Sequence, residues 1–425
     1  MPPIVFLGSL IGAMALGMPI AYALLVSGIV LMISIGGFDT QLIAQNLVNG
    51  ANSFALLAVP FFILAGEFMN AGGISKRIIS FALAFVGHIR GGLGYVGIIA
   101  AVIFAGLSGS AVADTAAIGA VLIPMMAKAG YNINRSAGLV AASGIIAPII
   151  PPSIALILYG VSSGTSITKL FMAGIVPGLI IAAALVITWW WVARKDQVQV
   201  YPRQSMQQVL IAGKEAFWAL MMPVIIIGGM RLGIFTPTEA GIVAAFCALF
   251  ISVVIYRSMK IKDIYQCLIS AAKTSSVVMF LVAAAMLSSY LITVANVTTL
   301  ITDWMAPLIE QPMLLMFVIN VVVFLVGTAM DLTPTVLILT PVLMPMIDAA
   351  GIDPVYFGIV FILNNCIGLL TPPVGTVLNV AAGVSKISME DIIKGVTPFL
   401  IVEIMVLILL ILFPGIVTAP LGWFH

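Results

Sequence analysis

The stretch Gly368-Leu-Leu-Thr-Pro-Pro-Val-Gly-Thr376 interrupts a long apolar run, and Ala147-Pro-Ile-Ile-Pro-Pro-Ser153 interrupts another. Proline has no N–H, so neither run can continue through its proline pair with all helical hydrogen bonds intact. An unpaired carbonyl costs on the order of several kcal/mol in hydrocarbon, so broken backbone is tolerated where it lines a cavity or is buried in protein. The helix-breaking residues are Pro148, Pro151, Pro152, Pro372 and Pro373. We predict two membrane helices broken for function, although two simple proline kinks would leave the same pattern.

The two breaks belong to an internal repeat. Positions 372 and 151 differ by 221, and this offset also aligns Gly106 with Gly327 without a gap. The matching residues are mostly Gly and Pro, which determine the path of the backbone. Repeats of this size in a membrane protein suggest a transporter with two related halves around a central site.

Composition assigns the chain to the membrane. Its 425 residues are 62% hydrophobic and only 8% charged, whereas a soluble domain carries about 25% charged residues. The net charge of +2 is too small to indicate nucleic acid as a partner. The first basic residue is Lys76, so no basic, cleavable signal segment is expected. Two histidines and three isolated cysteines offer little for catalysis or a transition-metal site. We expect an all-α polytopic membrane protein that is not an enzyme.

Each half contains a segment that is too long to cross a membrane once. Residues 94–128 would form a helix of about 50 Å, against a hydrocarbon core of about 30 Å. Its middle reads Gly106-Leu-Ser-Gly-Ser-Ala-Val-Ala-Asp-Thr115, which favours a hairpin turning at the Ser-Gly-Ser tip. Residues 312–347 repeat the form around Gly327-Thr-Ala-Met-Asp-Leu-Thr-Pro-Thr335. We therefore predict two helical hairpins, each with an acid and several hydroxyls at its tip.

Freed carbonyls and nearby hydroxyls are hard oxygen ligands, which suit a small cation such as sodium. One predicted sodium site uses Gly106, Ser108, Ala147 and Ile150. Its repeat partner uses Gly327, Gly368, Thr371 and Val374. No cofactor and no metal other than sodium is expected.

The hairpin tips and helix breaks also present helix N-termini, whose partial positive charge favours an anionic substrate. The predicted substrate-binding residues are Ser110, Asp114, Ser153, Asp331, Thr335 and Thr376. An ionisable residue within a membrane segment is a functional candidate by default. For Asp331 a helix N-cap is the alternative interpretation, because Asp is also a preferred cap.

These motifs, with Ile149-Ile-Pro-Pro-Ser and Met330-Asp-Leu-Thr-Pro-Thr, resemble the large membrane (M) subunit of tripartite ATP-independent periplasmic (TRAP) transporters. The resemblance covers essentially the whole chain. It implies an inverted-repeat, elevator-type transporter in the bacterial inner membrane, driven by sodium ions at two or more sites. It also implies a small four-helix membrane subunit as a separate chain and a periplasmic substrate-binding protein. The second half is most similar to the sialic-acid members, which implies N-acetylneuraminate as the substrate, although C4-dicarboxylate members share these motifs.

In such a transporter the hairpins and broken helices move against a fixed scaffold that packs on the small subunit and lipid. The expected organisation is a first scaffold segment with an interfacial arm (1–90), a first transport repeat (91–193), a linker (194–214), a second scaffold segment (215–311) and a second transport repeat (312–425). Two alternatives stay open from sequence. One is a stand-alone sodium–carboxylate carrier, and the other is a channel or scaffold subunit that does not couple transport to an ion.

Overall fold

The computed structural model describes residues 2–194, 198 and 201–422. Within these residues the chain is helical throughout and contains no strand. Nine helices of this described part are long and apolar enough to cross a membrane. The predicted linker (194–214) falls partly outside the description, because residues 195–197 and 199–200 are not part of it. The predicted all-α membrane fold is confirmed.

The helices of each half follow one another with short connections. The first half has α1 (Pro2–Ala15), α2 (Ile20–Ser34), α3 (Thr40–Ala51), the 3-10 helix η1 (Phe54–Leu57), α4 (Ala58–Ala71), α5 (Ile74–Val86), α6 (Gly92–Ser108), α7 (Ala111–Lys128), α8 (Ile133–Gly144), α9 (Ile154–Ser163) and α10 (Ile167–Ala193). The second half has α11 (Met206–Arg231), α12 (Pro237–Phe250), the π-helix η2 (Ile251–Ile255), α13 (Ile261–Val294), α14 (Val297–Ile309), α15 (Pro312–Ala329), α16 (Leu332–Ala349), α17 (Pro354–Gly368), α18 (Thr376–Ser385), α19 (Met389–Leu412) and α20 (Gly415–Gly422).

The repeat is visible in the helix boundaries. Adding 221 to the bounds of α7, 111–128, gives 332–349, which are the bounds of α16. The packing is reciprocal as well, since α7 contacts α18 while their repeat partners α16 and α9 contact each other. An exchange of this kind is what a two-fold relation between the halves produces.

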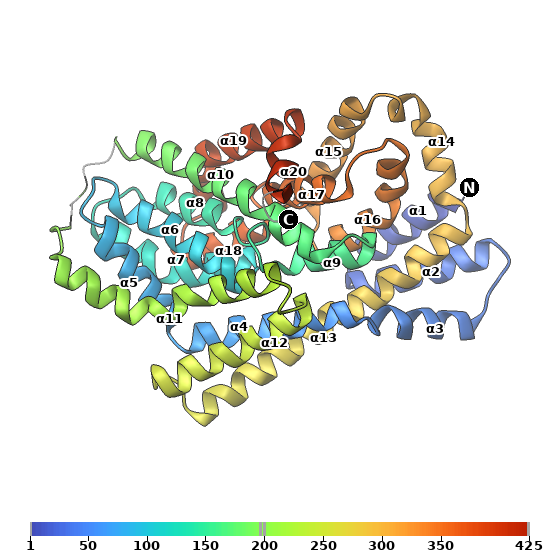
Figure 1. Ribbon diagram of the computed structural model, residues 1–425. Helices are drawn as coiled ribbons and strands as arrows, with labels where there is room; N and C mark the ends of the chain where they lie inside the picture. Colours follow the sequence, from blue (N-terminus) through green and yellow to red (C-terminus); the bar gives the residue numbers. More distant parts are fainter. Residues whose placement is uncertain (1, 195–197, 199–200, 423–425) are drawn as a thin grey trace.

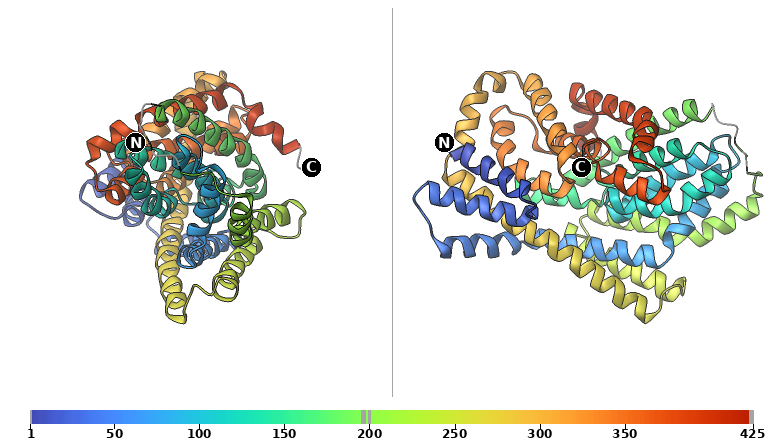
Figure 2. Two further views of the ribbon diagram at one scale, coloured as in Figure 1. Left: turned by 90° about the vertical axis from the view of Figure 1, so that its left-hand side faces the viewer. Right: turned by 180° about the vertical axis from the view of Figure 1, so that it is seen from behind.

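The scaffold helices follow the same repeat, which the matching of Gly and Pro did not detect. Adding 221 to the bounds of α2, 20–34, gives 241–255, and the helical stretch α12–η2 ends at 255. Helix α2 packs on α13, and α4 packs on α12. Helices α3, α4, α12 and α13 run along one side of the molecule (lower edge of Figure 1), and the hairpins and broken helices lie on the other side (Figures 1 and 2).

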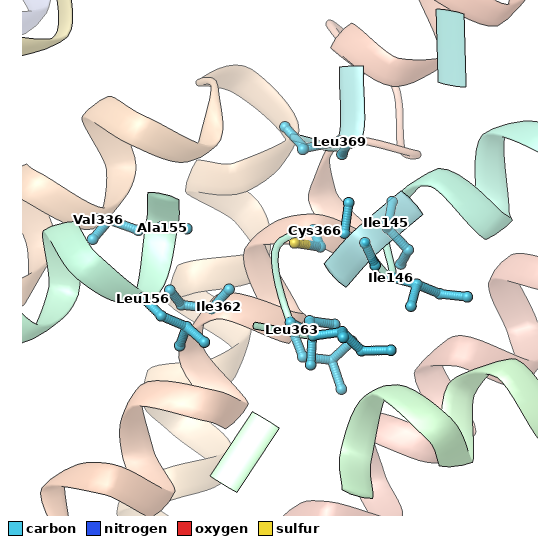
Figure 3. Packing of buried hydrophobic residues seen from close by; sticks show 14 of the residues in the cluster. Ile145, Ile146, Ala155, Leu156, Val336, Ile362, Leu363, Cys366 and Leu369 are labelled. Carbon is cyan, nitrogen blue, oxygen red and sulfur yellow. The ribbon is translucent and has the colours of Figure 1, made fainter. Parts of the chain in front are cut away.

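The two predicted hairpins and the two predicted helix breaks are confirmed. Helices α8 and α9 have 12 and 10 residues, and α17 and α18 have 15 and 10. None of these pieces reaches the roughly 20 residues that cross a bilayer. Figure 3 shows Ile145 and Ile146 of the first break close to Cys366 and Leu369 of the second. The breaks of the two halves therefore meet in one apolar core.

Glycines allow the two halves to approach closely between α8 and α19. Gly138 lies directly against Gly395, and a Cβ on Gly395 would lie 1.9 Å from the carbonyl oxygen of Asn134. The side-chain amide of Asn134 also donates to Asp391 at 3.2 Å. Because the obstructing atoms are backbone, this contact has little room to adjust.

We expect Gly395→Ala to lower the free energy of unfolding by about 1–3 kcal/mol, the usual cost of overpacking. The matched control is Gly228→Ala in α11, where an added Cβ would meet nothing within 4 Å. Thermal unfolding of the purified protein in detergent measures both variants. Equal melting temperatures for the two variants would contradict the close approach of α8 and α19.

Candidate substrate and ion site

A cavity of about 400 Å³ lies where the hairpin tips and helix breaks face α4 and α13. Its walls come from both halves of the chain and from the scaffold helices. The polar and charged side chains among its lining residues are Glu67, Asn70, Ser108, Ser110, Thr274, Asp331 and Thr333. Of the residues predicted from sequence to bind substrate, Ser110 and Asp331 line this cavity, and so does Ser108, which was predicted to bind sodium.

The first hairpin tip is held against the first helix break. Gly109 turns the chain with φ +63°, and a Cβ there would lie 2.6 Å from the carbonyl oxygen of Pro152. Ser110 follows as the N-cap of α7, where its hydroxyl accepts a hydrogen bond from the N–H of Ala113 at 3.4 Å. The N-terminal end of α7 therefore opens directly into the cavity.

Asp114 lies one turn into α7 and behind the cavity wall. Its side chain is 2% exposed, and its Oδ1 accepts a hydrogen bond from the hydroxyl of Ser108. Its Oδ2 has no hydrogen-bond partner among the described residues. Asp114 was predicted to bind substrate, but this position next to Ser108 suits an ion ligand better than a substrate contact.

The second hairpin tip brings Asp331 and Thr376 together. Asp331 occupies the N-cap position of α16 but makes no capping hydrogen bond with its side chain. Instead, its Oδ1 accepts a hydrogen bond from the Thr376 hydroxyl at 3.2 Å, across to the first residue of α18. Thr335, also predicted to bind substrate, is fully buried and donates to the Asp331 carbonyl at 2.8 Å. The alternative role of Asp331 as a helix cap is therefore not the one its side chain plays.

Ser153 supports the first break from within. Its hydroxyl donates to the Pro148 carbonyl at 2.5 Å and accepts from the N–H of Leu156 at 3.2 Å. The side chain is fully buried and is not among the residues that line the cavity.

Among the described residues, no side-chain hydroxyl supports the Leu369 carbonyl of the second break in this way. Leu369 is the repeat partner of Pro148, and the prolines that follow it at 372 and 373 have no N–H to offer its carbonyl. The repeat partner of Ser153 is Val374, which has no hydroxyl. Leu369 lines the cavity. Its carbonyl is therefore a candidate ligand that we missed, although the proline pair signals it.

The carbonyls predicted to be freed are partly satisfied by tighter turns. The Gly368 carbonyl accepts from the N–H of Thr371 at 2.9 Å, as in a 3-10 turn. The N–H of Val374 donates to the Thr328 carbonyl at 3.1 Å and so joins the break to the second hairpin. A carbonyl has two lone pairs, so sodium ligation by Gly368 and Thr371 stays a prediction.

The remaining predicted sodium ligands lie at the same two places. A Cβ on Gly106 would lie 3.8 Å from the Pro151 carbonyl oxygen, so the first hairpin packs on the first break. A Cβ on Gly368 would lie 2.6 Å from the carbonyl carbon of Gly327, so the second hairpin packs still more closely on the second break. Ala147 and Ile150 are buried within the first break.

Buried oxygens without hydrogen-bond partners occur in both halves. In the described residues they include Asp114 Oδ2, Thr115 Oγ1, Ser143 Oγ, Asn364 Oδ1 and Asn365 Oδ1. Ser143 and Asn364 are repeat partners, since 143 plus 221 is 364. Buried polar atoms are normally paired, and carboxylate, hydroxyl and amide oxygens are ligands for a hard cation. The residues present in each half therefore fit a sodium ion.

The scaffold wall of the cavity carries its own polar groups, which sequence reasoning missed. Glu67 and Asn70 come from α4, and Thr274 comes from α13. Glu67 Oε1 accepts a hydrogen bond from the Ser270 hydroxyl at 2.8 Å, which holds the carboxylate across the α4–α13 contact. The available signal was that Glu67, the first glutamate of the chain, lies near the end of an apolar run.

Comparison with known proteins identifies the family to which this chain belongs. Residues 7–416 match the family model of the tripartite ATP-independent periplasmic transporter, DctM component. The 2,3-diketo-L-gulonate TRAP transporter large permease protein YiaN of Escherichia coli is 56% identical over 425 residues, covering 100% of each chain. The sialic acid TRAP transporter large permease protein SiaM of Vibrio cholerae is 38% identical over 96% of each chain. The C4-dicarboxylate TRAP transporter large permease protein DctM of Pseudomonas aeruginosa is 37% identical over 90% of this chain and 89% of its own.

A solved structure shares the fold. The crystal structure of the YdaH transporter of Alcanivorax borkumensis matches with a TM-score of 0.65 over 87% of each chain. The sequences are only 14% identical, so this likeness concerns the fold alone.

We expect Asp331→Asn to abolish solute uptake while leaving thermal stability unchanged. The change keeps the size of the side chain and removes its charge, and a charge-assisted hydrogen bond is roughly twice as strong as a neutral one. The control is Asp353→Asn at the start of α17, where the aspartate does cap its helix through the N–H groups of Val355 and Tyr356. That variant should transport normally, because Asn also caps well. Near-normal uptake by Asp331→Asn would show that Asp331 does not belong to the binding site.

Proposed function

This chain belongs to the DctM family of tripartite ATP-independent periplasmic transporters, and from that premise we propose that it couples the entry of sodium to the uptake of a sugar acid. It is a large permease subunit, a multi-pass protein of the inner membrane and not an enzyme. The sodium, the class of solute and the partner chains are the proposed part. The observation that supports the solute class best is the mixture of helix N-termini and carboxylates around one cavity.

The helix N-termini account for an acidic solute. The first residues of α7 and of α16 line the cavity from opposite halves of the chain. Each helix presents unpaired N–H groups and a partial positive charge at this end. A carboxylate at either tip would accept hydrogen bonds from these groups without a basic side chain.

The carboxylates that line the cavity account for hydroxyl groups on the solute. Glu67 and Asp331 line the cavity from the scaffold and from the second hairpin. At neutral pH a carboxylate accepts hydrogen bonds, so it pairs with hydroxyl groups and repels a second carboxylate of the solute. This combination favours a solute with one carboxylate and several hydroxyls. The solutes in the names of YiaN and SiaM, 2,3-diketo-L-gulonate and sialic acid, both fit that description. N-acetylneuraminate, expected from sequence, is one member of this class.

Sodium coupling is supported by the buried oxygens without partners near each hairpin. A buried polar group left unpaired costs about 1–3 kcal/mol, and a bound cation would offset that cost in both halves. A cation next to the cavity would also stabilise a solute carboxylate through Coulomb attraction. Sodium and an acidic solute would then bind more tightly together than alone, which is the thermodynamic requirement for symport.

The arrangement also supports the proposed movement and partners. The cavity lies between a body built of hairpins and broken helices and a scaffold that includes α4 and α13. We propose that the body moves across the membrane while the scaffold stays in contact with a small membrane subunit and lipid. As a component of a tripartite system, the chain would receive its solute from a periplasmic binding protein.

A C4-dicarboxylate is the second candidate solute. One observation favours it, namely that two helix N-termini reach the cavity and each could accept one carboxylate. The relative named DctM, at 37% identity, is a C4-dicarboxylate permease by name. The carboxylates of Glu67 and Asp331 would repel the second carboxylate of such a solute, and we therefore place it second.

We expect uptake by the complete three-component system in proteoliposomes to require an inward sodium gradient. When potassium replaces sodium, uptake should fall to the level of vesicles without the permease, because potassium is too large for compact oxygen sites. Undiminished uptake in potassium, following an imposed proton gradient instead, would contradict sodium coupling. Uptake that needs no binding protein would identify a stand-alone carrier. Equilibration without accumulation would identify a channel.

We expect excess 2,3-diketo-L-gulonate or N-acetylneuraminate to compete with the transported solute, and succinate not to compete. Competition is measured as inhibition of labelled uptake at saturating sodium. Glu67→Gln should weaken competition by the sugar acids, because a neutral amide loses the charge-assisted hydrogen bonds to their hydroxyls. Strong competition by succinate in the wild type would favour the dicarboxylate assignment.

A further inference from the structure

Helix α19 carries a carboxyl group that the proposed transport site does not use. Glu403 lies near the middle of this 24-residue apolar helix, and its side chain is 1% exposed. Neither carboxyl oxygen has a hydrogen-bond partner in the described part of the chain. Asp114, the other buried acid in that part, has at least the hydroxyl of Ser108. Glu403 therefore has no donor of any kind to stabilise a negative charge.

No basic group compensates Glu403 either. Among the described residues no Lys, Arg or His is buried. The helices packed on α19 are α8, α10, α15, α17 and α18. Helices α15 and α18 carry no titratable side chain. The titratable side chains on the others are Arg135 near the start of α8, Lys169 near the start of α10, and Tyr356 and Cys366 on α17.

The charged residues of α19 itself lie far from Glu403. Glu390, Asp391 and Lys394 are all in the first two turns of the helix, more than two turns away from position 403. Burying an uncompensated carboxylate in such surroundings costs on the order of several kcal/mol of folding free energy. Binding a proton neutralises this carboxylate. A protonated carboxyl also becomes a donor, and backbone carbonyl oxygens of the helix can accept from it.

Helix α19, which carries Glu403, packs on α17. Helix α17 ends at Gly368, where the second break begins, and the next residue, Leu369, lines the cavity. Cys366 belongs to α17, two residues before Gly368, and faces the core where the two breaks meet (Figure 3). Movement of the second break would therefore change the surroundings of Glu403 directly.

The fold itself does not need an acid at this position. The repeat partner of Glu403 is Ala182, since 403 minus 221 is 182. Conversely, the first half has Asp114 in its hairpin where the second half has Thr335. Each half thus contains one deeply buried carboxyl, and the one in the second half lies on α19.

We propose that Glu403 is a proton-binding site of the moving body, and that its proton is exchanged during the cycle so that uptake moves a proton in addition to sodium and solute. The carboxylate takes a proton from the outer aqueous phase to become a neutral acid. The neutral acid crosses with the body and releases the same proton inside. This proposal goes beyond sodium coupling and does not depend on it.

The test measures protons and solute in the same proteoliposomes, with a pH-sensitive dye inside and the membrane potential clamped. Wild-type uptake should acidify the interior in a fixed ratio to solute. In Glu403→Gln, which resembles the neutral acid in shape, that ratio should fall to the background of vesicles without permease. The control is Glu390→Gln, which removes an exposed carboxylate of the same helix that pairs with Lys394 at 2.7 Å and should leave the ratio unchanged.

If Glu403→Gln does not fold, Glu403→Ala replaces it, because alanine stands at the repeat position. A wild-type permease that accumulates solute without moving protons overturns the proposal whatever the variants do. An undiminished proton ratio in a folded Glu403 variant overturns it as well, because the protons then travel with the solute or through another group. Sodium flux is recorded in the same vesicles, so a failure of sodium coupling is seen separately.

Discussion

The structure depends on satisfying broken backbone where no water is available. Each proline pair leaves carbonyls without their helical partners, and each half resolves this differently. In the first half the hydroxyl of Ser153 closes the break on the Pro148 carbonyl. In the second half no hydroxyl of the described residues closes on the Leu369 carbonyl, and Leu369 lines the cavity. The same constraint is therefore met by a serine hydroxyl in the first half and by 3-10 turns and a bond to the hairpin in the second, although the two share a backbone path.

Packing between the halves places these breaks at one point. The hairpin of each half leans on the broken helix of the other, α7 on α18 and α16 on α9. Glycines at 138 and 395 let α8 and α19 approach until their backbones touch. Because the contacts are exchanged in this way, neither break can move alone. The hairpins and broken helices form a single body, and the cavity lies where that body meets α4 and α13.

Much of this could be predicted because Gly and Pro act through the backbone. The hairpins, the breaks and the offset of 221 all follow from residues whose effect on chain path is local. The directions of side chains could not be predicted. Thr335 and Ser153 turn inward because neighbouring carbonyls accept their hydroxyls, while Glu67 reaches the cavity through a contact between helices 200 residues apart. The repeat in the scaffold stayed hidden because apolar residues on lipid-facing and helix-facing surfaces replace one another freely.

The acids of the molecule differ in what compensates them, and this difference separates their roles. Glu67 and Asp331 lie at the cavity, each with a hydroxyl partner, which suits the proposed recognition of a solute. Asp114 is buried with one donor and one open oxygen, which suits a cation. Glu403 is buried without a hydrogen-bond partner among the described residues, which suits the binding of a proton. Electrostatic cost rises along this series as solvent and partners are removed. On the proposals made here, solute, ion and proton would each bind at acids with progressively fewer partners.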